Sequence, residues 1–196
     1  MKKLTSVLFI IFIIFSAKAF AAENKMVKRI TEGKDGAKIT IIAYESLTCG
    51  HCANFHKDVY PELKKDFIDK GLVRIEFRHF PLDLAAFNAS KIAQCNNDGS
   101  SSIMNILYSG QKKWARGKTP EEATGYLKKF LEGENVNIDF DKCLSDKAIE
   151  DYILNDRIEG VKKFKVNATP TIIINDKKFD KALNYKNLKK YLEKLI

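Results

Sequence analysis

Apolar and polar positions in the first half of the chain follow a strand, helix, strand order. Residues 39–44 form a β-branched, apolar run that is typical of a buried strand, and 27–31 could form a short edge strand before it. Apolar residues then recur at helical spacing through Phe67, and Pro61 is expected to kink this helix. Residues 72–80 alternate as a further strand, so the pattern predicts a right-handed crossover and a parallel strand pair.

The pattern changes after this strand, where alternation stops and helical spacing takes over. Three helices are expected, at residues 85–94, 103–114 and 120–131. The last part of the chain predicts a long helix at 146–165, strands at 168–175 and 177–179, and a terminal helix at 185–195. The order indicates an α/β fold whose halves, residues 22–81 and 151–196, flank a helical insertion at 82–150.

The first 21 residues have the pattern of an export signal peptide. Lysines at positions 2 and 3 give a basic start, residues 4–15 are mostly apolar, and residues 19–21 fit an A-x-A cleavage site. The apolar run is short for a membrane-spanning helix, so cleavage is predicted, with a retained membrane anchor as the alternative. Export to the periplasm or beyond would allow disulfides to persist.

The chain carries a formal net charge of +9, and its 34 lysine and arginine residues are scattered without forming a single basic block. This distribution indicates a solvated surface, with a steering role toward partners or a membrane surface as the alternative. The aromatic residues follow core spacing, so no nucleic-acid partner is expected.

The Cys49-Gly50-His51-Cys52 segment, between the buried strand and its helix, is the strongest candidate for chemistry. Cys49 falls at the helix start, where free N–H groups and the helix dipole stabilise a thiolate. Cys52 lies one turn along, close enough to form a disulfide with Cys49. His51 would add to this stabilisation if it were charged or donated a hydrogen bond. A purely structural disulfide, or a zinc site with His56, remains an alternative.

The motif and the element order together resemble the DsbA-type thiol:disulfide oxidoreductases, which are exported bacterial proteins with a helical domain inserted in a thioredoxin fold. The resemblance spans about residues 37–195. It also rests on the Phe-Pro-Leu segment at 80–82 and on Thr169-Pro170 before the late strand. It implies a cis Thr169–Pro170 bond beside the active disulfide, so that both residues belong to the site.

The resemblance also implies an activity and its partners. The expected protein introduces disulfides into reduced exported proteins, and a membrane protein of the DsbB type reoxidises it. No cofactor or metal ion is expected. A reductase or isomerase on the same scaffold is the alternative, and a non-catalytic binding module is a further one. A monomer is expected, because no spare dimerisation domain precedes residue 37.

One position departs from the family pattern. Many relatives carry an acid six residues before the first active cysteine, as a proton acceptor for the second thiol. This chain has Ala43 there, and Glu45 follows two residues later on the same strand face. Whether Glu45 handles the proton of Cys52 is left open by the sequence.

The two other cysteines, Cys95 and Cys143, both fall in the predicted insertion and are 48 positions apart. A structural disulfide between them would stabilise the fold by about 4 kcal/mol in the chain-entropy model. Some members of the family carry a second disulfide in the helical domain. Free thiols or a second redox role remain as alternatives.

Overall fold

The structure is a computed structural model that describes residues 26–196. The expected signal peptide at residues 1–21 lies outside the described residues. Across the described part of the chain, none of the helices combines the length and the apolar character that crossing a bilayer requires.

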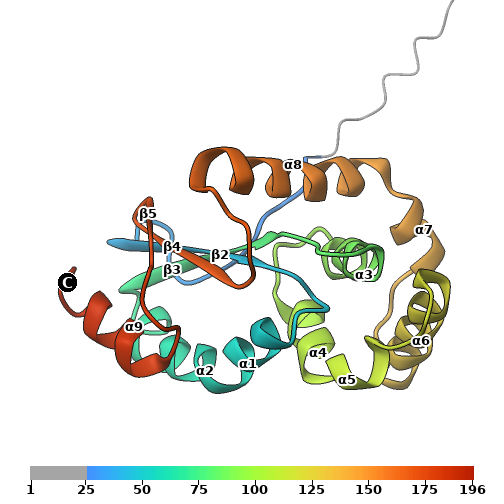
Figure 1. Ribbon diagram of the computed structural model, residues 1–196, viewed down its shortest axis with the longest axis horizontal. Coiled ribbons are helices and arrows are strands. Elements are labelled where there is room, and N and C mark those ends of the chain that lie inside the picture. Colours follow the sequence, from blue (N-terminus) through green and yellow to red (C-terminus); the bar gives the residue numbers. More distant parts are fainter. Residues whose placement is uncertain (1–25) are drawn as a thin grey trace, which may run out of the picture.

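A five-stranded mixed sheet lies at the centre of the molecule, in the order β1-β3-β2-β4-β5 (Figure 1). Its strands are β1 (Ile30–Glu32), β2 (Ile39–Glu45), β3 (Val73–His79), β4 (Thr171–Ile174) and β5 (Lys177–Lys178). Strands β2 and β3 run parallel, and the other neighbours are antiparallel. The predicted parallel pair is therefore confirmed.

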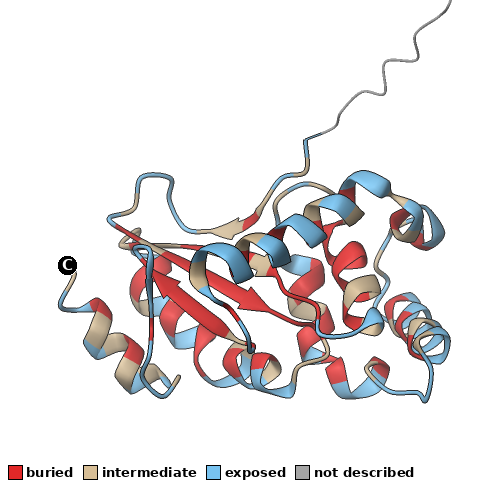
Figure 2. Cartoon of the chain, turned by 45° about the horizontal axis from the view of Figure 1, so that its top comes forward, coloured by how far each residue is buried: buried red, intermediate tan, exposed pale blue. Residues whose placement is uncertain are grey.

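Helices cover both faces of this sheet (Figure 1). One face carries α8 (Lys147–Phe164), and the other carries α1 (Gly50–Asp58), α2 (Tyr60–Leu63) and α9 (Tyr185–Leu192). Helix α8 lies close to the sheet at Gly160, where an added Cβ would come within 2.8 Å of the Tyr44 ring. Figure 2 shows buried residues along the central strands, as expected for a sheet that is packed on both sides.

The helix after β2 is divided near Pro61, where a kink was predicted. Helix α1 ends at Asp58, and Pro61 lies in the first turn of α2, where its missing N–H costs no hydrogen bond. A π-helical segment, η1 (Lys64–Ile68), follows directly.

The predicted insertion forms a separate group of helices at one end of the sheet (Figure 1). They are α3 (Leu84–Gln94), α4 (Ser102–Ser109), α5 (Gln111–Trp114), α6 (Pro120–Gly133) and α7 (Phe140–Ser145). The expected helix at 103–114 is divided at Gly110 into α4 and α5. Only glycine fits at this position, because a Cβ there would lie 2.0 Å from the Phe130 ring. Helix α7 was not expected, and the proposed boundary at residue 150 falls inside α8.

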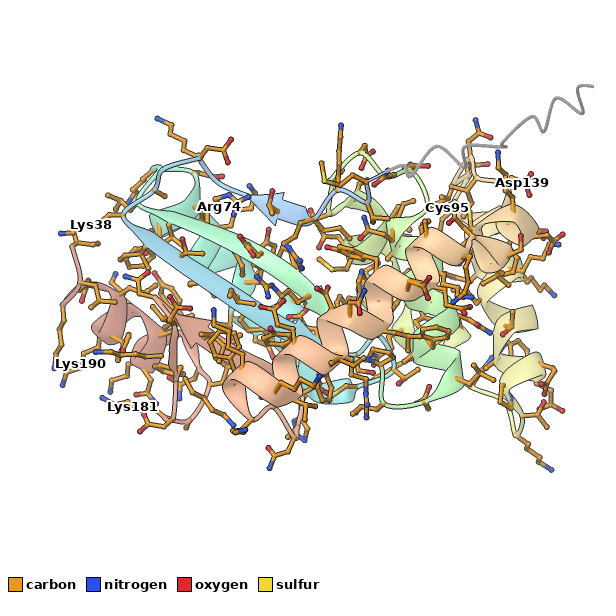
Figure 3. All side chains as sticks on the ribbon, turned by 90° about the horizontal axis from the view of Figure 1, so that it is seen from above. Lys38, Arg74, Cys95, Asp139, Lys181 and Lys190 are labelled. Atoms are coloured by element: carbon orange, nitrogen blue, oxygen red, sulfur yellow. A yellow bond between two sulfur atoms is a disulfide. The ribbon has the colours of Figure 1, made fainter. Side chains whose placement is uncertain are left out.

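A disulfide joins Cys95, directly after α3, to Cys143 in α7. Cys95 is labelled in Figure 3, within this group of helices. The bond connects the first helix of the group to its last, and thus holds the insertion together across 48 residues of sequence.

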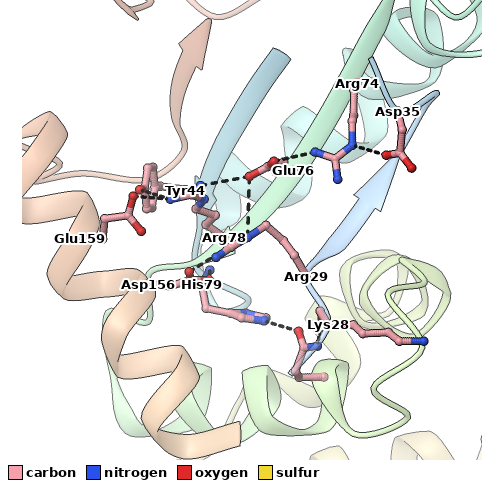
Figure 4. A network of polar contacts seen from close by, with 11 residues as sticks. Lys28, Arg29, Asp35, Tyr44, Arg74, Glu76, Arg78, His79, Asp156 and Glu159 are labelled. Carbon is pink, nitrogen blue, oxygen red and sulfur yellow. Dashed lines mark hydrogen bonds and ion pairs between the residues drawn. The ribbon is translucent and has the colours of Figure 1, made fainter. Parts of the chain in front are cut away.

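A network of charged side chains joins α8 to the sheet (Figure 4). The Asp156 carboxylate, on α8, lies 2.8 Å from the Arg29 guanidinium and accepts a 3.1 Å hydrogen bond from the His79 N–H. The His79 ring lies 3.3 Å from the side-chain oxygen of Gln94. Burial lowers the pKa of His79, which suits a neutral structural role.

Candidate active site

The Cys49-Gly50-His51-Cys52 segment begins helix α1. Cys49 is the residue immediately before the helix, and its carbonyl accepts a 3.2 Å hydrogen bond from the Ala53 N–H. Both active-site cysteines are free thiols in the structure. Cys49 is partly exposed, whereas Cys52 is 0% exposed, so a partner protein can reach only Cys49.

The surroundings of Cys49 favour its thiolate. They lower its pKa from 9.0 to about 5, chiefly through a hydrogen bond from the Cys52 thiol, with further donation by Thr169 and by the backbone N–H groups of Cys52 and His51. Burial opposes this shift. At neutral pH Cys49 is therefore ionised, as expected for a thiol at a helix start.

The surroundings of Cys52 have the opposite effect. Burial raises its pKa, and the negative charges of Cys49 and Glu45 raise it further. Cys52 therefore keeps its proton over the physiological range and donates to the Cys49 thiolate. The two cysteines are thus divided into one nucleophile and one buried thiol.

The loop before β4 brings Thr169 and Pro170 against Cys49. The Thr169–Pro170 peptide bond is cis, and the Cys49 sulfur lies 3.3 Å from the Thr169 carbonyl oxygen. The Thr169 hydroxyl is buried and has no partner among the described residues, so it is free to donate to a Cys49 thiolate. A hollow of about 500 Å³ extends from here and is lined by His51, Pro170 and Tyr185, among others.

The side chain of His51 is exposed on the first turn of α1. The part of His51 that lowers the pKa of Cys49 is its backbone N–H group. His51 lines both of the hollows that border α1.

Gln111 is a site residue that the sequence reasoning missed. Its side-chain nitrogen, in α5 of the helical group, donates to the carbonyls of Leu47 at 2.8 Å and Cys49 at 3.0 Å. The side chain is buried, so it holds the loop that carries Cys49 against the helical group. No local pattern marks this glutamine, because its partners lie more than 60 residues away in the sequence.

Glu45 and His56 form a buried pair in the core next to the cysteines. The two side chains are 4% and 6% exposed, and Glu45 Oε2 lies 2.8 Å from His56 Nε2. Helical spacing alone places His56 one turn after Cys52. Among residues 26–196, no group of three or more His, Cys, Asp and Glu side chains is placed to hold a metal ion.

A family model described as thioredoxin matches residues 25–194, nearly the whole described chain. The chain belongs to the thioredoxin family. The thioredoxin fold with an inserted helical domain, which the sequence predicted, is confirmed by this match and by the solved structures most like it.

Relatives of this thioredoxin-family chain are named for disulfide chemistry. A Rickettsia bellii protein, named as a candidate protein-disulfide oxidoreductase, is 30% identical over 78% of this chain and 58% of its own length. Disulfide bond formation protein D of Bacillus subtilis is 28% identical over 83% of this chain and 74% of its own length. The chain thus spans little more than half of the first relative.

Solved structures place the chain among DsbA proteins. The crystal structure of alpha-DsbA1 from Wolbachia pipientis has a TM-score of 0.76 and 29% sequence identity, and the match covers 87% of this chain and 92% of that one. The resemblance to DsbA-type proteins that the sequence motifs suggested is therefore confirmed for this thioredoxin-family member.

Proposed function

We propose that this protein is an exported thiol:disulfide oxidoreductase that introduces disulfide bonds into other exported proteins. The observation that carries the proposal is the opposite protonation of two neighbouring thiols. The pKa of Cys49 falls to about 5, while burial raises the pKa of Cys52. A structural disulfide or a binding module has no need of this division.

The reaction starts from the Cys49–Cys52 disulfide. A substrate thiolate attacks the Cys49 sulfur, the bond to Cys52 breaks, and Cys52 leaves with the electron pair and takes up a proton. A second substrate thiolate then attacks the substrate sulfur of the mixed disulfide, and Cys49 leaves as a thiolate. The substrate gains a disulfide by losing two electrons, and the two cysteines gain them.

The acidity of Cys49 sets the direction of exchange. Each tenfold gain in acidity favours the reduced pair by at most about 1.4 kcal/mol, or roughly 30 mV, and solvent screening at a partly exposed thiol reduces this. The hydrogen bonds to the Cys49 thiolate exist only in the reduced protein. They stabilise the reduced state, favour reduction of the Cys49–Cys52 disulfide, and so make this disulfide an oxidant. A reductase would need the reduced pair to be less stable.

Substrate binding is assigned to the hollow beside the cis Thr169–Pro170 bond. Pro170 has no N–H, and its loop lies directly beside the Cys49 sulfur, so an extended substrate segment can align with Thr169 there.

Export is inferred from the signal pattern of residues 1–21, with the periplasm as the destination. The protein would act as a monomer without a cofactor, and a membrane protein of the DsbB type would reoxidise it. The proposal also divides the chain into a first thioredoxin-fold half at 22–81, a helical insertion at 82–150 and a second thioredoxin-fold half at 151–196.

The test is the redox equilibrium of the Cys49–Cys52 pair with glutathione, followed by refolding of a reduced, scrambled protein. Cys49→Ser is expected to abolish exchange, and Cys52→Ser to accumulate mixed disulfides with substrate. The double variant Cys95→Ala, Cys143→Ala is the matched control and should keep exchanging. An equilibrium as reducing as that of a cytosolic reductase, combined with efficient insulin reduction, would contradict the oxidant assignment.

A further inference from the structure

A cavity of about 1000 Å³ lies beside the active-site helix and has no part in the reaction described so far. One wall comes from α1, and the other comes from the α4–α5 segment of the helical group. No residue of the Thr169–Pro170 loop lines this cavity, and it shares only His51 and Asn54 with the hollow beside that loop. A volume of this size can hold several side chains of a bound polypeptide.

The residues that line this cavity carry positive charge and no negative charge. Lys57 lies on the α1 wall, and Lys112 and Lys113 lie on the α5 wall. Within residues 26–196, no aspartate or glutamate lines the cavity. Lys113 lies 3.9 Å from the Glu134 carboxylate, whereas Lys57 and Lys112 are exposed and form no ion pair within the described part of the chain. The charges of these two lysines are therefore available to a ligand that carries carboxylates.

The cavity begins one residue away from the reacting sulfur. Gly50 and His51, the two residues after Cys49, line it on the α1 side. On the α5 side, Gln111 donates to the Cys49 carbonyl at 3.0 Å, and Lys112 follows it directly in the chain. An extended polypeptide advances about 3.3 Å per residue, so a substrate joined to Cys49 would present side chains roughly two to five positions from its own cysteine to this cavity.

The buried part of the lining differs from the exposed lysines. Tyr60 and Tyr108 are buried residues of the lining, and the Tyr108 ring stacks on the His56 ring with a centroid distance of 4.1 Å. A bound segment can therefore place an apolar side chain against the aromatic residues while its carboxylates meet the lysines. An apolar centre with a polar rim is the usual arrangement of a protein-binding surface.

We propose that this cavity is a second substrate subsite, which binds an acidic segment next to the cysteine that is being oxidised, with Lys57 and Lys112 as its specificity-determining residues. The inference rests on the proposed oxidase function and names a substrate class for it: exported proteins with aspartate or glutamate near the reacting cysteine. Charge selects this occupant, because a basic segment would be repelled. The substrate would run from the Thr169–Pro170 loop past Cys49 and over His51, which borders both hollows.

The experiment measures how fast the oxidised protein forms a mixed disulfide with three synthetic peptides that each contain one cysteine. The first peptide carries aspartate and glutamate before the cysteine, the second carries them after it, and the third has asparagine and glutamine in place of every acid. Each rate is compared between the native protein and the double variant Lys57→Gln, Lys112→Gln, so that the intrinsic reactivity of each peptide thiol cancels. The variant should react about 3- to 10-fold more slowly with at least one acidic peptide, and less than about twofold more slowly with the neutral one.

The double variant Lys190→Gln, Lys194→Gln is the matched control, because it removes the same charge at a distance from the cavity. Both lysines are exposed, and Figure 3 shows Lys190 at the end of the molecule away from the helical group. All three peptides should react with this control within about twofold of the native rate, since long-range charge is screened by salt. The pKa of Cys49 should be the same in all three proteins if the lysines act on the substrate and not on the thiolate.

An unchanged rate with both acidic peptides would overturn the inference. So would equal slowing of acidic and neutral peptides, or equal slowing by the two double variants, because either result indicates a general electrostatic effect. If the Lys57→Gln, Lys112→Gln variant does not fold, ¹⁵N NMR of the native oxidised protein decides. An acidic peptide with serine in place of cysteine should shift the amide signals of Lys57 and Lys112 more than the neutral one does, and equal shifts rule the subsite out.

Failure of the proposed function would give a different result. In that case none of the three cysteine peptides would open the Cys49–Cys52 disulfide, whereas the acidic serine peptide would still shift the signals of the cavity.

Discussion

At the scale of single residues, two identical side chains acquire opposite properties from their positions. Cys49 lies before the first turn of α1, where backbone N–H groups and the Cys52 thiol donate to its sulfur. Cys52 is three residues further on and is fully buried, so no water stabilises its charge. The thiol that stays protonated is the donor that stabilises the thiolate, so each state supports the other.

This division predicts how the stability of the reduced protein depends on pH. The pKa of Cys49 is about 5 in the folded protein and near its ordinary value of 9.0 in the unfolded protein. Between these two pH values the unfolded state therefore binds one proton more than the folded state. The free energy of unfolding should therefore rise by about 1–3 kcal/mol from pH 5 to pH 9, after allowance for solvent screening. Above about pH 9 it should fall, because folding keeps the proton on Cys52 that the unfolded chain loses.

Urea unfolding of the reduced and oxidised proteins between pH 5 and 10 measures this effect. The oxidised protein is the control, because its Cys49–Cys52 disulfide has no thiol to titrate. A difference between the two forms that stays constant from pH 5 to 9 would show that Cys49 is not acidified by folding.

At the scale of elements, the helical group takes part in the site although it supplies neither cysteine. Gln111 on α5 donates to two carbonyls of the loop that leads into α1. The α4–α5 segment also forms one wall of the larger cavity beside α1. The insertion is therefore expected to hold the geometry of Cys49 and not simply to enlarge the surface.

A Gln111→Glu substitution tests this role of α5. A carboxylate has the same shape but cannot donate to the Leu47 and Cys49 carbonyls, and it adds negative charge near the Cys49 thiolate. The free energy of unfolding should fall by about 1–3 kcal/mol, and the pKa of Cys49 should rise. Denaturant unfolding and the ultraviolet absorbance of the thiolate measure the two effects. The neighbouring exposed Lys112→Gln is the control, and a Cys49 pKa that is identical in all three proteins would exclude the role.

At the scale of the whole molecule, contacts between residues far apart in the sequence hold each of the two parts together, the sheet with its helices and the helical insertion. The charged network of Arg29, His79 and Asp156 fastens α8 to the sheet, and the Cys95–Cys143 disulfide joins α3 to α7. The disulfide lies among the helices of the insertion, and no thiol of the site contributes to it. It is expected to serve stability rather than exchange.

The Cys95→Ala, Cys143→Ala variant tests this expectation. Loss of a crosslink across 48 residues should lower the free energy of unfolding by about 4 kcal/mol, because the unfolded chain gains conformational freedom. The pKa of Cys49 and its exchange rate with glutathione should not change. Denaturant unfolding and thiolate titration measure both quantities, and an altered Cys49 pKa with full stability would reverse the assignment.

The hydrophobic pattern along the chain predicted most elements, because strands and long helices depend on local spacing. It located the parallel pair, the helix of the cysteine motif and the long helix α8. It missed α7, a short helix that Asp139 caps and that the disulfide holds. It also joined α4 and α5, because the apolar spacing continues across Gly110, and the approach of Phe130 that requires glycine there is not a local property of the sequence.

The sequence by itself determined which atoms can carry the chemistry: two cysteines at a helix start, and a threonine and proline before a late strand. Only the tertiary structure decided how far their protonation diverges, because the burial of Cys52 and the donation by Thr169 depend on segments that are distant along the chain. Thr169 lies 120 positions from Cys49, Gln111 lies 62 positions from it, and Glu45 meets His56 across 11 positions. Electrostatic effects on a thiol depend on distance and burial in space, which emerge only when the sheet and both groups of helices have packed.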